Sequence, residues 1–308
     1  MVHHRTATVR GHEIFYREAG AADAPVLLLL HGFPTSSHMF RDLIPLLAGR
    51  YRVIAPDHLG FGRSATPPAD AFPYTFDELA SLTAEFTDAI GLTRFALYIQ
   101  DYGSPIGLRL ALAHPDRITA IITQNGNAYR EGLGDAAWAP ILALIANRTP
   151  ETEAPVCGLH SLEVIQWQYT HGVPEEHRSL LSPDAWHHDA ALMARPGQDA
   201  IQLDLMADYG SNFDLYPAFQ EYFRTSRVPL LAVWGAHDEI FVPAGAEAFR
   251  RDLPDAEIHL LPTGHFALET HAGEIAGLID RFLVRVGVGV HDGVHVSRAD
   301  SAASSAPC

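Results

Sequence analysis

Residues 95–114, FALYIQDYGSPIGLRLALAH, read as a short strand, a sharp turn and a helix. The strand is predicted over residues 95–100, an apolar run with β-branched and aromatic members, and the helix begins near Pro105, whose fixed φ suits a first helical turn. Asp101 stands at the tip of the turn, and Gly103 removes a Cβ where strand and helix must cross closely. The rest of the chain can be placed around this unit.

Asp101 has two interpretations at this stage. A carboxylate at the tip of such a turn can displace a leaving group from an sp3 carbon, where a serine hydroxyl would attack an acyl carbon. The same residue could equally be the N-cap of a helix in any α/β domain. The remaining motifs of the chain decide between the two.

Length and composition indicate one large globular unit. The chain has 308 residues, 47% hydrophobic and 19% charged, which is enough for one α/β domain or one domain carrying an insertion. The net charge of -16 excludes nucleic acid and anionic membranes as expected partners. The first ten residues lack an apolar signal region, so a cytoplasmic protein is expected, either a monomer or a homodimer.

The cysteines and histidines give no framework for a disulfide or a metal. Cys157 and Cys308 are the only two cysteines, and their spacing fits no metal site. The 18 histidines form no HExxH or comparable ligand pattern. We therefore expect no metal and no cofactor. His31 and His58, in loops after strands, are expected to fix the backbone through hydrogen bonds.

Strands alternate with helices along most of the chain, which predicts a mostly parallel sheet covered on both faces. A hairpin is predicted over residues 6–18. Further strands are predicted at residues 26–30, 52–55, 95–100, 118–123, 229–235 and 258–261. Helices are predicted at residues 35–48, 75–90, 244–253 and 273–286.

The alternation stops between residues 127 and 225. This stretch holds no convincing buried strand and is rich in Trp, Tyr, His and Pro, so it is predicted to be a helical cap inserted between two strands. The core of the fold is then residues 1–126 and 226–286. Residues 287–308 are small, polar and aperiodic, and a mobile tail is predicted there.

Three functional side chains follow three separate strands. Asp101 follows the strand 95–100, Asp238 follows 229–235 and His265 follows 258–261. Because the carboxyl ends of parallel strands meet at one edge of a sheet, these side chains should converge. Their chain order is nucleophile, acid and histidine. The backbone N–H of Phe33, after the strand 26–30, can pair with that of Tyr102 to form an oxyanion hole.

Five short motifs occur in order: HGFP at residues 31–34, DHLGFGRS at 57–64, QDYG at 100–103, WGAHD at 234–238 and TGHF at 263–266. Over residues 6–286 the chain resembles the epoxide hydrolase and haloalkane dehalogenase branch of the α/β-hydrolases. The resemblance implies an α/β-hydrolase fold with a cap and an alkyl-enzyme ester formed on Asp101. It also implies that His265, supported by Asp238, activates water to cleave that ester, while the Phe33 and Tyr102 amides hold the oxyanion.

The resemblance leaves the leaving group open. Epoxide hydrolases of this branch use cap tyrosines to protonate the alkoxide, whereas the dehalogenases bind halide with N–H donors, commonly a tryptophan directly after the nucleophile. Tyr102 and Phe33 stand at two dehalogenase donor positions and so favour an epoxide. The tripeptide Ile99-Gln100-Asp101 instead resembles the dehalogenase elbow.

Two cap tyrosines are the candidates for the acid. Tyr209 resembles the second cap tyrosine of the epoxide hydrolases, and Tyr169 is the candidate for the first. Either could be a packing residue, and Tyr129 or Tyr216 could replace Tyr169. The remaining large cap aromatics, which are expected to line or pack the cap, are Trp138, Trp167 and Trp186.

The sequence therefore predicts a hydrolase of a small apolar epoxide that yields a diol. Haloalkane dehalogenase is the alternative. A further alternative is a ligand-binding protein or lyase on the same scaffold, because a fold does not fix a function.

Overall fold

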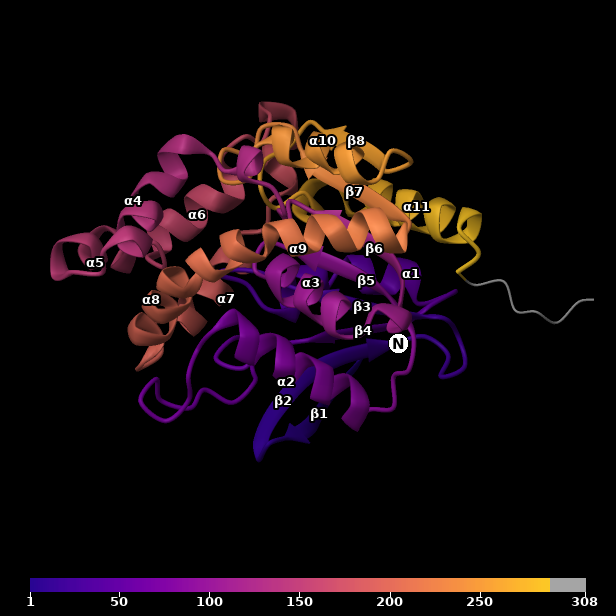
Figure 1. Cartoon of the computed structure of the whole chain (residues 1–308), viewed down its shortest axis with the longest axis horizontal. Coiled ribbons are helices and arrows are strands. Elements are labelled where there is room, and N and C mark those ends of the chain that lie inside the picture. Colours follow the sequence, from indigo (N-terminus) through magenta and orange to yellow (C-terminus); the bar gives the residue numbers. More distant parts are fainter. Residues whose placement is uncertain (289–308) are drawn as a thin grey trace, which may run out of the picture.

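The computed structural model describes residues 1–288, and its centre is one sheet of eight strands in the order β1-β2-β4-β3-β5-β6-β7-β8 (Figure 1). From β4 to β8 all neighbouring strands are parallel, and β1 and β2 join antiparallel at one edge. The strands are β1 His3–Val9, β2 His12–Ala19, β3 Val26–Leu30, β4 Arg52–Pro56, β5 Phe95–Gln100, β6 Ile118–Gln124, β7 Leu230–Gly235 and β8 Glu257–Leu261. The predicted fold class, mostly parallel α/β, is confirmed.

The predicted hairpin is β1 and β2, which pair from His3↔Glu18 to Val9↔His12. The two-residue connection is Arg10 and Gly11, both with positive φ (49° and 82°). Two positive φ values in a two-residue loop match the right-handed twist of the flanking strands. The hairpin therefore extends the sheet at its antiparallel edge, beyond β4.

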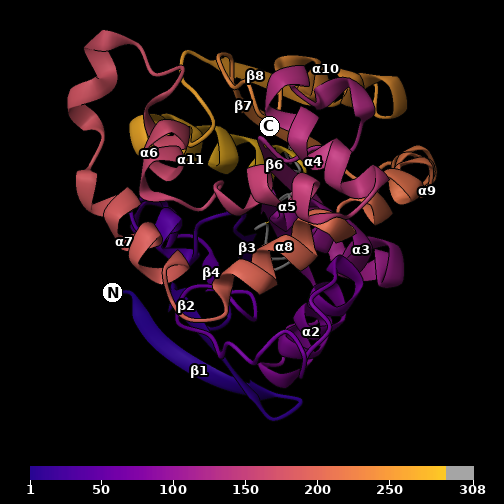
Figure 2. The ribbon, with the colours of Figure 1, turned by 90° about the vertical axis from the view of Figure 1, so that its left-hand side faces the viewer.

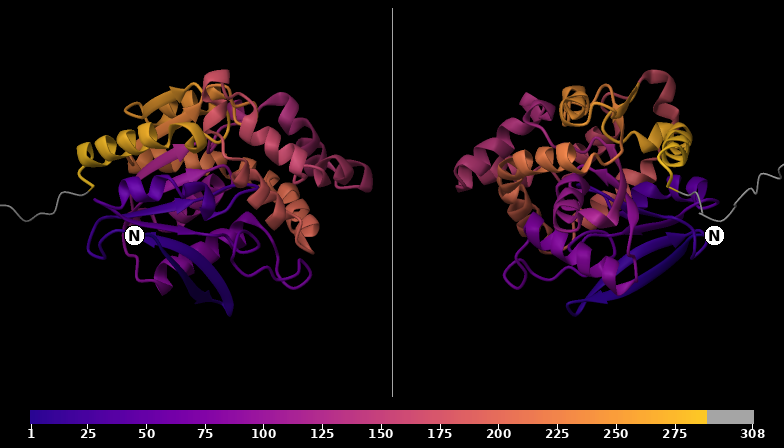
Figure 3. Two further views of the ribbon diagram at one scale, coloured as in Figure 1. Left: turned by 180° about the vertical axis from the view of Figure 1, so that it is seen from behind. Right: turned by 45° about the vertical axis from the view of Figure 1, so that its right-hand side comes forward.

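Helices cover both faces of the sheet. On one face α2, α3, α9 and α10 form a layer in which each helix contacts the next, and on the other α1 contacts α11 (Figure 3). These helices are α1 Leu43–Leu47, α2 Phe76–Ala89, α3 Gly103–Ala113, α9 Gly210–Ser226, α10 Pro243–Asp252 and α11 Leu268–Arg285. A 3-10 turn, η2 Pro115–Arg117, leads from α3 into β6. The core strands β3, β5 and β7 are almost wholly buried between the two layers.

Two helices differ from the sequence prediction. The helix predicted at residues 35–48 is broken into a 3-10 turn, η1 Ser37–Phe40, and the short α1. Pro45 explains the break, because its ring would clash with the carbonyl of Arg41 in a continuous helix and it has no N–H to donate. Helix α11 begins at Leu268 rather than residue 273, with non-helical φ at His271 (-126°) marking a kink.

The insertion between β6 and β7 is helical, as predicted, and its helices α4 to α8 gather on one side of the molecule (Figures 1 and 2). Its elements are η3 Arg130–Gly132, α4 Asp135–Ala146, α5 Pro150–Cys157, α6 Leu162–Thr170, η4 Glu175–Leu180, α7 Pro183–Met193 and α8 Gln198–Asp208. The predicted cap range 127–225 also takes in most of α9, which packs against α3 and α10.

The predicted mobile tail, residues 287–308, lies outside the described residues from position 289 onward. No helix in residues 1–288 is both long and apolar enough to cross a membrane.

Candidate active site

Asp101 occupies a strained turn between β5 and α3. Its φ is +47°, in the left-handed region that non-glycine residues seldom adopt, at a cost of about 1–3 kcal/mol. The turn is tight because a Cβ at Gly103 would overlap the backbone carbonyl group of Leu30. A Cβ at Gly32 would likewise overlap the side chain of Asp101. Two glycines thus make room for a buried carboxylate at the end of the central strand.

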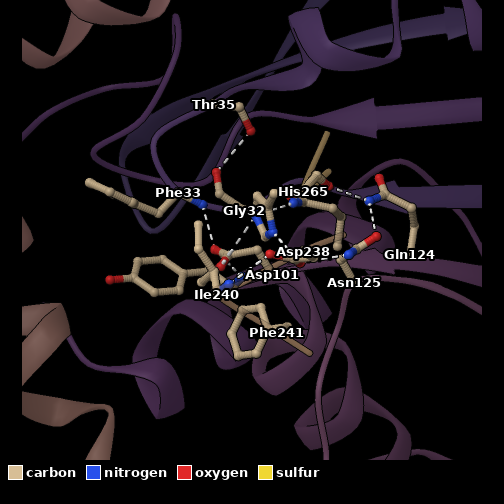
Figure 4. A network of polar contacts seen from close by, with 12 residues as sticks. Gly32, Phe33, Thr35, Asp101, Gln124, Asn125, Asp238, Ile240, Phe241 and His265 are labelled. Atoms are coloured by element: carbon tan, nitrogen blue, oxygen red, sulfur yellow. Dashed lines mark hydrogen bonds and ion pairs between the residues drawn. The ribbon is translucent and has the colours of Figure 1, made fainter. Parts of the chain in front are cut away.

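One oxygen of Asp101 is held by two backbone amides. Its Oδ1 atom accepts hydrogen bonds from the N–H of Phe33 at 2.7 Å and of Tyr102 at 2.6 Å. Figure 4 shows the Phe33 amide pointing at this carboxylate. The structure therefore brings together the two amides predicted as an oxyanion hole. The other oxygen, Oδ2, accepts no hydrogen bond from residues 1–288 and is available to a substrate.

His265 and Asp238 lie in the loops after β8 and β7. The Nδ1 atom of His265 is 2.8 Å from Oδ2 of Asp238. Asp238 also accepts a hydrogen bond from the Asn125 side-chain amide at 2.6 Å on Oδ2 and from the Ile240 N–H at 2.8 Å on Oδ1. These bonds, visible in Figure 4, keep Asp238 in place and orient the imidazole ring.

Burial and charge shift the pKa values of the two central groups. Burial raises the pKa of Asp101, and the facing imidazole of His265 and the two amide bonds oppose that rise only in part. Burial alone lowers the pKa of His265, but the carboxylates of Asp238 and Asp101 outweigh it, so the pKa lies above its ordinary value. Neutralising Asp101 by alkylation would remove one of these two charges and make His265 easier to keep neutral.

A cavity of about 130 Å³ opens over Asp101 between the core and the cap. An apolar cavity of about 150 Å³ is enough to hold one benzene molecule. The core contributes three of the lining residues: Phe33, Asp101 and Tyr102. The cap and the Asp238 loop contribute the others: Ala137, Trp138, Ile141, Leu159, Val164, Trp167, Gln168, Met206 and Ile240. The lining suits a small apolar ligand.

The structure does not place the predicted cap tyrosines in this lining. Tyr169 donates its hydroxyl to Asp189 at 2.5 Å, and its ring stacks on Phe266 at 4.3 Å. Tyr209 is buried with its ring 6.2 Å from that of Tyr102.

The alternatives for the first cap tyrosine do not line the cavity either. The Tyr129 hydroxyl donates to Asp252 at 2.9 Å, and the Tyr216 hydroxyl accepts from Asn127 at 3.3 Å. The hydroxyls of Tyr169, Tyr129 and Tyr216 are therefore already engaged with protein groups.

Three cap side chains that carry nitrogen donors are among the lining residues of the cavity. Trp138, Trp167 and Gln168 line it, whereas Trp186 does not. The Trp138 indole N–H is already bonded to the carbonyl of Ile240 at 2.9 Å. Among residues 1–288, the Trp167 indole and the Gln168 carboxamide have no hydrogen-bond partner, so α6 contributes two side chains with unpaired N–H groups to the lining that Asp101 shares.

Two polar residues of the site were missed by the sequence analysis. Asn125, directly after β6, holds Asp238, and Gln100, the last residue of β5, lies with its Nε2 atom 3.0 Å from Nε2 of His265. Both are polar residues at the carboxyl end of a buried strand. That position was the available signal, because it is the same edge at which Asp101, Asp238 and His265 converge.

The loop histidines fix the backbone, as expected. His31 contacts the carbonyl of Gly32 through Nδ1 at 3.0 Å and accepts the His58 N–H through Nε2 at 3.1 Å. The His58 ring in turn contacts the His31 carbonyl at 2.9 Å. Across the described residues, no group of three His, Cys, Asp or Glu side chains could hold a metal ion.

Comparison with known proteins identifies the family of this chain. Residues 25–272 match the family model for the alpha/beta hydrolase fold. A Saccharomyces cerevisiae protein named as an uncharacterized hydrolase is 46% identical over 286 residues, which are 89% of this chain and 94% of that protein. A haloalkane dehalogenase of Mycobacterium marinum is 44% identical over 112 residues, 36% of this chain and 37% of that protein.

One solved structure extends the comparison to the whole fold. The epoxide hydrolase CorEH superposes with a TM-score of 0.74 at 19% identity, over 93% of this chain and 100% of that one. At that identity the likeness concerns the fold alone.

Proposed function

Because this chain belongs to the α/β hydrolase family, we propose that it is a hydrolase that uses Asp101 to displace a leaving group from a saturated carbon of a small apolar substrate. The observation that carries the proposal is the asymmetric carboxylate of Asp101. Two amides bind Oδ1, while Oδ2 is free of hydrogen bonds from residues 1–288 and belongs to a side chain that lines the cavity. A free carboxylate oxygen in an apolar cavity is a nucleophile for carbon.

The reaction proceeds in two half-reactions. Oδ2 of Asp101 forms a bond to the substrate carbon as the leaving group departs with its electron pair. Water then adds to Cγ of Asp101 while His265 takes its proton, and the Phe33 and Tyr102 amides hold the oxyanion on Oδ1. Collapse breaks the Cγ–Oδ2 bond, and the product alcohol leaves with the proton from His265. The second proton of the water is released to solvent as the Asp101 carboxylate re-forms. Asp238 stabilises the imidazolium between these steps.

Halide is the leaving group that we propose first. Sequence similarity to haloalkane dehalogenases covers about a third of the chain, including 44% identity to that of Mycobacterium marinum, and the cavity lining includes Trp167 and Gln168 but no cap tyrosine. The N–H groups of Trp167 and Gln168 are proposed to receive the halide. Halide is thus proposed ahead of an epoxide, whereas Tyr102 and Phe33 in the sequence favoured an epoxide.

An epoxide remains the second candidate because of Tyr102. Its ring lines the cavity, and its buried hydroxyl has no hydrogen-bond partner within residues 1–288. A phenol is a suitable donor to the alkoxide that an epoxide leaves behind. In an epoxide-opening reaction, Tyr102 rather than Tyr169 or Tyr209 would supply the proton to the alkoxide.

Matched substrates separate the two candidates. Bromobutane and butene oxide fit a cavity of this size, and release of bromide or of the diol by purified protein is measured for each. We expect bromide release that disappears in Asp101→Asn. The control Asp252→Asn alters another buried carboxylate, which binds Tyr129 and Arg224 outside the cavity, and should retain turnover.

Labelled water tests the covalent step directly. In a single turnover in water labelled with heavy oxygen, the label should appear in Asp101 and not in the alcohol. Label in the alcohol alone would contradict the ester intermediate. Formation of diol without bromide would select the epoxide candidate. If the wild type releases neither bromide nor diol, both candidate functions are contradicted.

A further inference from the structure

Gln100 is a wholly buried side chain in direct contact with the general base. It is the last residue of β5, next to Asp101, and its Nε2 atom lies 3.0 Å from Nε2 of His265. Its Oε1 atom is buried without a hydrogen-bond partner in the described part of the chain. A Cβ on Gly32 would lie only 2.6 Å from that oxygen, so the carboxamide sits in the crowded space beside the nucleophile.

The contact between Gln100 and His265 defines the tautomer of the resting base. With Nδ1–H donated to Asp238, the Nε2 atom of neutral His265 carries a lone pair, and the Gln100 N–H group can donate to it. The same lone pair must accept the proton of the hydrolytic water. The Gln100 N–H group must therefore give up this contact as the water approaches His265.

When His265 is protonated, its Nε2–H needs a hydrogen-bond acceptor from Gln100 instead of a donor. Two N–H donors would then face each other at a separation of 3.0 Å, which is repulsive. The Oδ2 atom of Asp101 is 3.9 Å away and is part of the ester at that stage. The unpartnered Oε1 atom of Gln100 is the nearby acceptor, and a half-turn of the carboxamide brings it to Nε2.

We propose that Gln100 is a positioning residue for the hydrolysis half-reaction: its carboxamide caps neutral His265 with N–H and accepts from the imidazolium with Oε1. This inference rests on the proposed function, because it acts on the ester step. In that step water loses a proton to His265 and adds to Cγ of Asp101. The proton leaves with the alcohol when the Cγ–Oδ2 bond breaks, and the carboxamide then returns to its first orientation.

The surroundings of His265 make the pH dependence of adduct hydrolysis a specific test of the role of Gln100. Within residues 1–288 the titratable groups that face it are Asp238 at 2.8 Å and Asp101 at 3.9 Å. The aromatic rings of Phe241 and Phe266 cover its other sides. Once Asp101 is esterified, Asp238 and the residue at position 100 control the pKa of the base.

Two variants test the proposal by quenched-flow mass analysis of the bromobutane adduct. Gln100→Met keeps the length of the side chain and removes donor and acceptor. We expect the adduct to form at nearly the wild-type rate and to hydrolyse about 10- to 100-fold more slowly, as for loss of a hydrogen bond to a charged group. Gln100→Glu offers only acceptors, so the midpoint of the hydrolysis rate against pH should rise by about one unit or more.

Gln198→Met is the matched control. Gln198 opens α8, is as fully buried as Gln100, and donates its Nε2 to the backbone carbonyl of Gly60 at 2.7 Å, outside the cavity lining. It should lose stability to a similar degree without moving the pH midpoint.

Failure of the proposal for Gln100 and failure of the proposed function give different results. Equal slowing of adduct formation and hydrolysis in Gln100→Met, or an unchanged midpoint in Gln100→Glu, would overturn the role of Gln100. If Gln100→Glu does not fold, the ratio of the two rates in Gln100→Met decides alone. Failure of the wild type to form any adduct on Asp101 would instead contradict the proposed function.

Discussion

The Nε2 atom of His265 lies 3.9 Å from Oδ2 of Asp101, which is beyond hydrogen-bond distance. A serine nucleophile needs such a bond because its proton must be removed before attack. A carboxylate attacks as an anion and needs no base for the first step. The separation therefore matches a site in which the histidine is held for the second, hydrolytic step.

Replacing the base should strand the ester. In His265→Gln, bromobutane is expected to alkylate Asp101 with little loss of rate, and the adduct should persist because no group takes the proton from water. Intact-mass analysis would then show a protein heavier by one butyl group. A protein of unchanged mass after long incubation, with Asp101→Asn as the blank, would count against the mechanism.

Asn125 should support the base through Asp238. Its φ is +49°, so Asn125→Gly removes the amide without adding backbone strain. Loss of the 2.6 Å bond to Asp238 is expected to cost about 1–3 kcal/mol of unfolding free energy, measured by urea titration. Hydrolysis of the adduct should slow as well, and wild-type rates in both assays would show that Asn125 is dispensable.

The free N–H groups of α6 should act on the first step only. Gln168→Met keeps the length of the side chain and Trp167→Phe keeps a smaller aromatic ring, and both remove the donors proposed for halide. Each is expected to slow alkylation by bromobutane about tenfold, the effect of one hydrogen bond to an anion, and to leave adduct hydrolysis unchanged. Stopped-flow measurement of bromide release checks the first rate. Unaltered alkylation in both variants would contradict this role and favour Tyr102 as the donor to the leaving group.

The cap tyrosines provide a contrasting test. Tyr169→Phe loses the hydrogen bond to buried Asp189 and should be less stable by about 1–3 kcal/mol. Because the hydroxyl of Tyr169 is engaged there, turnover of either substrate should stay close to that of the wild type. Turnover of both substrates should likewise stay close to that of the wild type in Tyr209→Phe. A specific loss of diol formation in either variant would restore the original prediction that these tyrosines protonate an epoxide.

Stability should fall in mild acid. Burial lowers the pKa of His31 to about 4 and that of His58 well below its ordinary value of 6.5. Since these folded-state values lie below the unfolded value, the unfolded chain binds more protons, and stability decreases as the pH falls from 6.5 towards 4. The contribution of His31 is about 3 kcal/mol over that range. Urea titrations at several pH values would detect it, and a flat profile between pH 7 and 5 would contradict it.

Much of the site follows from the sequence because parallel strands bring their carboxyl ends to one edge. Buried apolar runs fix where β5, β7 and β8 end, and the residues that follow them, Asp101, Asp238 and His265, are brought together without further information. The Phe33 and Tyr102 amides follow by the same reasoning.

The orientation of the cap side chains and the contacts of Gln100 were decided only by the tertiary structure. The cap helices carry aromatic residues on several faces, so periodicity cannot tell whether Tyr169, Tyr209 or Trp167 turns towards the cavity. Their orientation depends on how the helices pack, which placed Tyr169 on Asp189 and left α6 to offer Trp167 and Gln168. Gln100 and His265 are 165 residues apart, and a contact between side chains at that separation has no local signature in the sequence. The sequence by itself determined the strand ends and the groups they carry, while packing between distant elements determined which of the other polar groups reach them.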